Sequence, residues 1–168
     1  MALKEYCIYV SEEPSEGRAS PQVFRCTVFA KNEVRARSII FRTLRIQQKM
    51  KSTGSVILKI EEVPQYADMK IRTFGVRAVY RSRSGLHNYY KEINAVSKTA
   101  AVERLYQDVA GRHHAPPQRV TIVEAAEVPV DDVTDKELLQ IMKEPKFPLF
   151  EKRVPANAPC FEVVPVNY

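Results

Sequence analysis

Residues 30–64 read AKNEVRARSIIFRTLRIQQKMKSTGSVILKIEEVP, and residues 95–129 read AVSKTAAVERLYQDVAGRHHAPPQRVTIVEAAEVP. Aligned without gaps, the two stretches are offset by 65 residues and share six identical positions. The identical positions are Ala30/Ala95, Ala36/Ala101, Ile57/Ile122 and the closing Glu62-Val63-Pro64/Glu127-Val128-Pro129. Self-similarity at a fixed offset indicates a tandem repeat, so we expect the same structural unit twice.

Each stretch opens with a predicted helix. Asn32 and Ser97 are both good N-cap residues, and apolar residues follow each of them at i, i+4 and i+8 spacing, as on a buried helix face. These residues are Ala36, Ile40 and Leu44 in the first copy and Ala101, Leu105 and Val109 in the second. We therefore expect helices over residues 33–50 and 98–113. Ile39, Ile46 and Met50 should extend the apolar side of the first helix, which should stop with Gly54 near its C-cap.

Strands surround each predicted helix, because β-branched and aromatic residues are enriched before and after it. The predicted strands cover residues 5–10, 23–29 and 56–63 in the first copy and residues 73–80, 88–95 and 119–128 in the second. This pattern predicts an α+β fold of two tandem ββαβ units, residues 1–64 and 65–129. One helix on three strands makes a thin core, so we expect the units to pack as one pseudo-symmetric body and share buried surface.

Two further segments follow the repeat. Thr134 and Glu137 have the spacing of a capping box ahead of apolar residues, which predicts a short helix within residues 130–144. Residues 145–168 contain five prolines and should form an extended tail. Several apolar side chains of this tail are expected to dock on a protein neighbour. They are Phe147, Leu149, Phe150, Phe161, Val163 and Val164.

Composition excludes several classes of protein. The 168 residues are 45% hydrophobic and 27% charged, which favours a folded chain. No apolar run reaches the roughly 18–20 residues of a membrane span, and the start does not resemble a signal peptide. We therefore expect a cytosolic or nuclear protein with no membrane partner. The three cysteines are far apart, which argues against a disulfide scaffold and against a zinc module.

The positive charge is unevenly distributed. The net charge is +6 for the whole chain, made up of +4 in residues 1–64, +6 in residues 65–119 and −4 in residues 120–168. A basic body with an acidic end indicates an anion-binding face and a separate contact segment.

The first predicted helix carries a basic stripe. Arg35, Arg42, Arg45 and Lys49 fall within one narrow arc of the helical wheel, opposite the apolar face, and Lys51 extends this surface. A row of cations on one side of a helix suits a phosphate backbone, because each guanidinium can bind phosphate oxygens. A merely solvated helix face remains an equal alternative at this point.

A second group of candidate RNA-binding residues lies in the second copy. It comprises Arg81, Ser82, Arg83, Ser84, His87, Asn88, Lys91, Arg112, His113 and His114. Cations, hydroxyls and stacking rings together are typical of contacts with irregular or single-stranded RNA. The alternatives are a plain hairpin turn with strand aromatics in the core, and favourable interactions of the last three residues with a helix C-terminus.

Nothing in the sequence indicates catalysis. The chain lacks the motifs of a Walker loop, a nucleophile elbow and a zinc protease. We expect no enzyme, no cofactor, no metal and no small-molecule substrate. An RNA-modifying enzyme would need a pocket holding a carboxylate and a displaced base.

Several ordered motifs resemble a known family. They include Phe74-Gly75, Ser82-Arg83-Ser84-Gly85, His87-Asn88, Tyr90-Lys91-Glu92, Arg112-His113, Lys49-Met50-Lys51-Ser52 and Lys146-Phe147-Pro148-Leu149. Over about residues 4–154 the chain resembles the eukaryotic large-subunit ribosomal protein family called eighteen-a in the older naming and eL20 in the unified one. Unlike the usual Arg/Lys-rich family tail, residues 156–168 hold no Lys or Arg.

The resemblance implies two tandem ββαβ units and a structural role in the cytoplasmic large ribosomal subunit, after assembly in the nucleolus. It implies contacts with rRNA and with neighbouring ribosomal proteins, and no catalysis. The implied RNA contacts are the loop of residues 82–88, Lys91, Arg112, His113 and the turn of residues 49–51. The alternative is an extra-ribosomal protein–protein adaptor whose basic face meets an acidic partner.

Overall fold

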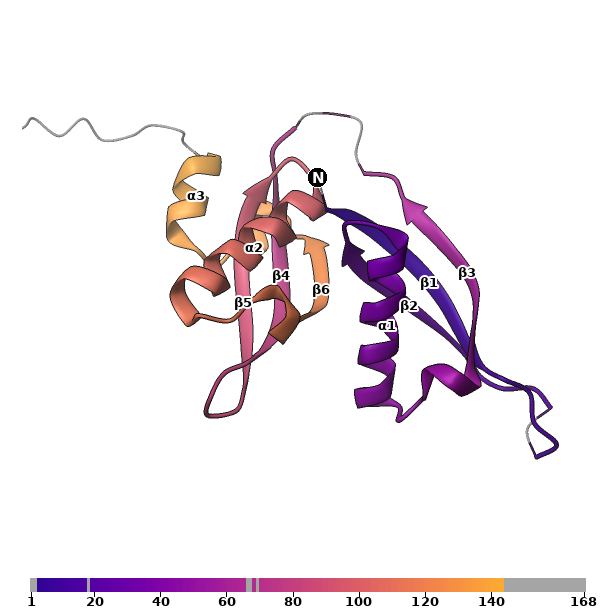
Figure 1. Cartoon of the computed structure of the whole chain (residues 1–168). Coiled ribbons are helices and arrows are strands. Elements are labelled where there is room, and N and C mark those ends of the chain that lie inside the picture. Colours follow the sequence, from indigo (N-terminus) through magenta and orange to yellow (C-terminus); the bar gives the residue numbers. More distant parts are fainter. Residues whose placement is uncertain (1–2, 18, 66–67, 69, 144–168) are drawn as a thin grey trace, which may run out of the picture.

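Two three-stranded antiparallel sheets, each with one long helix against it, make up the chain (Figure 1). The computed structural model describes residues 3–17, 19–65, 68 and 70–143. The first unit contains β1 (Lys4–Glu12), β2 (Val23–Ala30), α1 (Glu33–Gln47), the 3-10 turn η1 (Ser52–Gly54) and β3 (Ser55–Val63). Its strand order is β2-β1-β3, so β1 is the central strand.

The second unit has the same plan. It contains β4 (Arg72–Arg81), β5 (Leu86–Ala95), α2 (Lys98–His113), the 3-10 turn η2 (Pro117–Arg119) and β6 (Val120–Glu127). Its strand order is β5-β4-β6, with β4 in the centre. The predicted α+β fold of two ββαβ units is confirmed, whereas the tail lies outside the described residues.

The repeat extends to details that no residue identity indicates. The turns η1 and η2 are 65 residues apart, and so are the two left-handed residues that follow the helices, Lys49 (φ 58°) and His114 (φ 49°). Each central strand also slips by one residue against the third strand of its unit, which leaves Leu58 in β3 and Val123 in β6 without a register partner. Both units therefore share one backbone plan under different sequences.

Each unit has its own core. Ile8 and Val10 of β1 pack with Ala36, Ile40 and Leu44 of α1 in the first. The second core is built on Phe74 and Val76 of β4 with Leu105 and Val109 of α2, among others. The expected shared surface is small: Phe29, near the end of β2, is buried in the second core, and Leu3 packs against it.

The end of α1 differs from the sequence prediction. The helix ends at Gln47 instead of residue 50, because Lys49 turns into the left-handed region. This turn brings Met50 into the first core, where only 4% of it is exposed. Gly54 ends η1 and does not cap the helix, so that prediction is wrong. Ile46, predicted on the apolar side, is 75% exposed.

A short helix, α3 (Lys136–Lys143), follows η3 (Val130–Asp132) and is held by a buried carboxylate. Glu92 of β5 accepts hydrogen bonds from the backbone N–H groups of Thr134 (3.0 Å) and Asp135 (3.0 Å) and from the Thr134 hydroxyl (2.8 Å). Burial favours the neutral acid, but these hydrogen bonds outweigh it and lower the pKa of Glu92.

The predicted capping box of Thr134 and Glu137 is not what begins α3. The Thr134 hydroxyl donates to Glu92, a charged and therefore stronger acceptor. The side chain of Asp135 instead accepts from the Glu137 N–H at 3.0 Å and caps the helix. None of the helices in the described ranges is long and apolar enough to cross a membrane.

Candidate nucleic-acid interface

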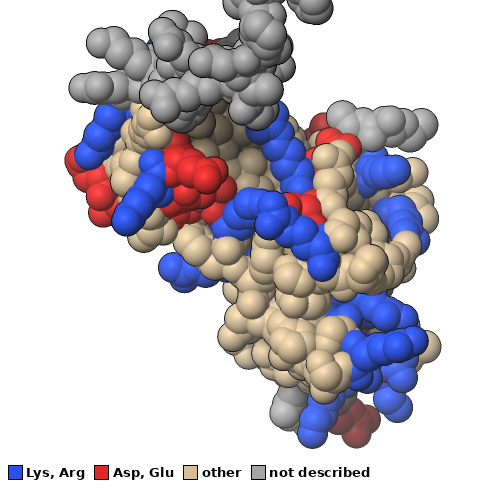
Figure 2. Space-filling model, turned by 90° about the vertical axis from the view of Figure 1, so that its left-hand side faces the viewer, with Lys and Arg blue, Asp and Glu red and all other residues tan. Residues whose placement is uncertain are grey.

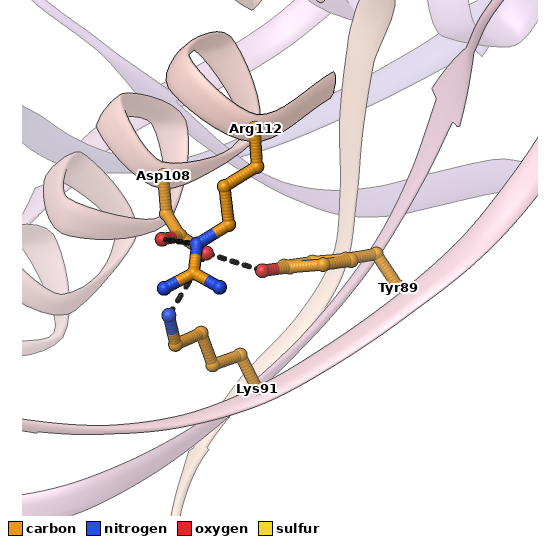
Figure 3. A network of polar contacts seen from close by, with 4 residues as sticks. All are labelled: Tyr89, Lys91, Asp108 and Arg112. Atoms are coloured by element: carbon orange, nitrogen blue, oxygen red, sulfur yellow. Dashed lines mark hydrogen bonds and ion pairs between the residues drawn. The ribbon is translucent and has the colours of Figure 1, made fainter.

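Two predicted RNA contacts, Lys91 and Arg112, meet at one carboxylate (Figure 3). Asp108 lies on the last turns of α2, one turn before Arg112, and faces β5. Lys91 Nζ lies 2.8 Å from Asp108 Oδ2, and Arg112 Nε lies 2.8 Å from Oδ1. The hydroxyl of Tyr89 also donates a hydrogen bond to Oδ2. We call these four residues the Asp108 centre.

The Asp108 centre fixes the ionisation of its own members. Partial burial disfavours the charged carboxylate, but hydrogen bonds from Lys91 and Tyr89 and the two neighbouring cations lower the pKa of Asp108 to about 2. Burial and the bond to Asp108 raise the pKa of Tyr89 to about 12. The centre therefore carries two cations and one anion at neutral pH. Its net positive charge is presented outward, because the Arg112 side chain is 71% exposed.

Next to the Asp108 centre, four aromatic rings gather around Tyr80 of β4. The imidazole of His87 stacks on the Tyr80 ring with 5.1 Å between centroids and 25° between planes. His113, at the end of α2, stacks on the same ring at 4.9 Å and 24°. Tyr89 meets both Tyr80 (6.2 Å) and His113 (5.5 Å) edge-on. We call Tyr80, His87, Tyr89 and His113 the Tyr80 stack.

The loop between β4 and β5 is closed by its own hydroxyl groups. Ser82 N–H donates to Gly85 O at 2.8 Å, and Ser82 Oγ accepts from the Ser84 N–H at 3.1 Å. The same Ser82 hydroxyl lies 2.7 Å from Nε2 of His87, which ties the loop to the Tyr80 stack. Arg81 and Arg83 are exposed beside this closed turn. The plain hairpin turn and the candidate binding loop are therefore the same feature.

The predicted basic stripe of α1 is divided by the structure. Arg35 and Arg42 line a cleft of about 730 Å³ between the two units, whose walls include the edge strands β2 and β6. Arg42 Nη1 donates to the backbone oxygen of Gln118 at 2.6 Å and so joins the units. Arg45 is exposed and does not line the cleft. Lys49 leaves the stripe because it lies beyond the helix in a left-handed conformation.

One tyrosine from the second unit also lines this cleft. Burial raises the pKa of Tyr106 to about 12, against an opposing effect of the positive charge of Arg42. The side chain of Arg42 thus acts between the units, on Gln118 and on Tyr106.

The structure brings one group of predicted residues together and leaves the others apart. Lys91, Arg112, His87, His113 and the Ser82 loop converge at one end of the second unit. Asn88 and His114 are exposed near it, as is Lys51 in the first unit, but no contact joins these three to that group. Figure 2 shows Lys and Arg over much of one face and Asp and Glu gathered mainly near the C-terminal residues. This distribution matches the charge asymmetry of the sequence.

Two residues that organise this surface are missing from the sequence prediction of the site. Asp108 could have been found, because it precedes Arg112 by four residues on a predicted helix, the spacing of an ion pair. Tyr80 carries no such signal, since it reads as an ordinary strand aromatic. The predicted protein contacts Phe147, Leu149, Phe150, Phe161 and Val163 lie outside the described residues.

Comparison with known proteins places the chain among proteins of the ribosome. Residues 3–126 match the family described as the ribosomal proteins 60S-L20, which its description also calls large-subunit proteins eighteen-a. The chain therefore belongs to this ribosomal protein family, as its motifs suggested.

Individual relatives agree with the family match over most of their length. The large ribosomal subunit protein eL20 of Candida albicans is 36% identical over 149 residues, covering 88% of this chain and 87% of the relative. Protein eL20A of Schizosaccharomyces pombe is 35% identical over 155 residues, or 91% and 88% of the two chains. Protein eL20 of Drosophila melanogaster is 30% identical over 151 residues, or 89% and 85%.

Proposed function

We propose that this protein is a structural constituent of the cytosolic large ribosomal subunit, where it binds rRNA and neighbouring ribosomal proteins and supports subunit assembly. The observation that carries the proposal is the family match over residues 3–126. Assembly in the nucleolus and the lack of a catalytic role are parts of the same proposal. No comparison favours the alternative of an extra-ribosomal adaptor.

The geometry supports a passive mode of RNA binding. Cations bound to phosphates release counterions, and this electrostatic gain dominates non-specific affinity for nucleic acids. Lys91 and Arg112 are held in place by Asp108, so less side-chain freedom is lost when a phosphate arrives. Arg81 and Arg83 add charge beside the closed loop. The apolar residues of 145–168 supply the proposed contacts with protein neighbours.

Sedimentation of a cell extract through a sucrose gradient tests the proposal. Blotting should find the protein at one copy per large subunit, and RNase should remove it from those fractions. Sedimentation in light fractions with or without RNase would overturn the proposal and revive the adaptor.

A charge-matched pair of variants tests the interface itself. The variant Arg83→Ala/Lys91→Ala/Arg112→Ala removes three cations from the proposed interface and should be depleted from large subunits. A control should remove three cations that form ion pairs on other surfaces, and this control should still co-sediment. The control substitutions are Arg37→Ala, Lys59→Ala and Arg77→Ala. Circular dichroism checks that both variants fold, and equal depletion of both would contradict the proposed interface.

A further inference from the structure

We propose that the Tyr80 stack is a binding site for one unpaired nucleobase of RNA, which stacks on the exposed imidazole faces of His87 and His113. This inference rests on the proposed RNA-binding function and adds the class of ligand group that this part of the surface takes. It assigns the two histidines to a base and leaves the phosphates to the surrounding cations.

The first argument is the exposure of the rings. Tyr80 is only 8% exposed and forms the floor of the cluster. Both histidines that stack on it are exposed. Each imidazole is therefore supported from behind by a buried ring and still has surface open to solvent. An unstacked base offers a flat π-face of matching shape, and base–aromatic stacking is the main way in which proteins hold single-stranded nucleotides.

The second argument is preorganisation. The hydrogen bond between Nε2 of His87 and the Ser82 hydroxyl, at 2.7 Å, fixes one imidazole through the closed loop. The other imidazole contacts both Tyr80 and Tyr89, and Tyr89 is itself held by its hydrogen bond to Asp108. Rings that are already fixed lose little conformational entropy when a ligand stacks on them.

The third argument is the chemistry around the rings. Arg83 lies in the loop beside His87, and Arg112 precedes His113 on α2, so each exposed imidazole has a guanidinium close to it in the chain. Arg112 is 71% exposed, which leaves donors available in addition to the Nε atom bound to Asp108. A flat apolar platform bordered by cations fits a base attached to a phosphate backbone better than it fits an apolar peptide.

Two RNA hairpins that differ only at one bulged nucleotide test this inference with the full-length protein. One hairpin carries a bulged adenosine, and the other carries an abasic residue at the same place, so the backbone and its charge are the same. Fluorescence anisotropy gives both dissociation constants. Stacking of one base contributes about five- to one-hundred-fold in affinity, so the adenosine hairpin should bind that much more tightly.

Two double variants separate stacking from charge and from fold. His87→Ala/His113→Ala should bind both hairpins equally, at the affinity that the normal protein shows for the abasic hairpin. His87→Phe/His113→Phe keeps two flat rings without the imidazole nitrogens, so it should retain the preference for adenosine. A cluster with a purely structural role would lower the melting temperature in the alanine variant without changing the ratio of affinities.

The outcomes distinguish this inference from the proposed function. Equal affinity of the normal protein for both hairpins, or an unchanged ratio in the alanine variant, would overturn the base site and leave ribosomal RNA binding intact. Failure to bind either hairpin at low salt, together with sedimentation in light fractions, would overturn both.

Discussion

Replacing Asp108 by Asn tests the electrostatic origin of the candidate surface. The substitution keeps the size of the side chain and an oxygen that can accept the Tyr89 hydrogen bond, but it removes the negative charge that both Lys91 and Arg112 bind. Two cations would then lie close together without a counterion, and we expect the folded protein to be less stable at neutral pH.

The size of the effect follows from the ionisation of Asp108. Its pKa is lowered from the ordinary value of 3.8 to about 2, a difference that corresponds to at most about 2.5 kcal/mol of stabilisation when the carboxylate is charged. The Asp108 side chain is 17% exposed and that of Arg112 is 71% exposed, so water screens the interaction. We therefore expect Asp108→Asn to lower the free energy of unfolding by about 1–1.5 kcal/mol at pH 7.

The pH dependence has a defined sign. A carboxyl group whose pKa is lower in the folded state stabilises the protein above its ordinary pKa, and this stabilisation disappears as the pH falls through the lowered value. The difference between the normal protein and the variant should be constant from pH 7 to pH 5 and should shrink between about pH 4 and pH 2.

Urea unfolding followed by far-UV circular dichroism measures this difference, since the chain contains no tryptophan for fluorescence. Glu103→Gln is the matched control, because it removes one negative charge from an exposed site on the same helix. The control should change the free energy of unfolding by less than about 0.5 kcal/mol. A deficit in Asp108→Asn that stays the same from pH 5 to pH 2.5 would refute the electrostatic explanation.

Four further substitutions test the packing around the interface. Gly75→Ala should destabilise the protein by about 1–3 kcal/mol in thermal unfolding, since an added Cβ would lie 2.8 Å from atoms of two neighbouring side chains. Gly111→Ala, which meets nothing within 4 Å in α2, should instead stabilise it by about 0.5–1 kcal/mol. Glu92→Gln weakens the acceptor that holds the start of α3, so hydrogen exchange should accelerate in α3 while β4 stays protected; unchanged exchange would contradict this role. Arg42→Ala removes the hydrogen bond between the units and should broaden the inter-unit distances measured by small-angle X-ray scattering, whereas Arg45→Ala should not. Because each unit keeps its own core, Arg42→Ala should change the free energy of unfolding by less than about 1 kcal/mol.

The order of elements in both units follows from local patterns in the sequence. Ala36, Ile40 and Leu44 lie on one helix face because an α-helix repeats every 3.6 residues, and all three are buried as predicted. The 65-residue offset then transfers the same plan to the second unit. Local patterning fails at the end of α1, since no propensity favours the left-handed backbone that Lys49 adopts.

The composition of the surface is also present in the sequence. The basic residues of the loop, of β5 and of the end of α2 could be selected from their type alone, and most of them are exposed. Their pairing could be anticipated only where helical spacing brings two residues together, as for Asp108 and Arg112.

Tertiary structure alone decided which of these residues act together. Lys91 and Asp108 are 17 residues apart, Arg42 and Gln118 are 76 apart, and Glu92 and Thr134 are 42 apart. Such contacts depend on how a strand, a helix and a connecting segment are oriented in space, and no period of the sequence encodes that orientation. The Tyr80 stack arises in the same way, because β4, β5 and the end of α2 each supply a ring to one place.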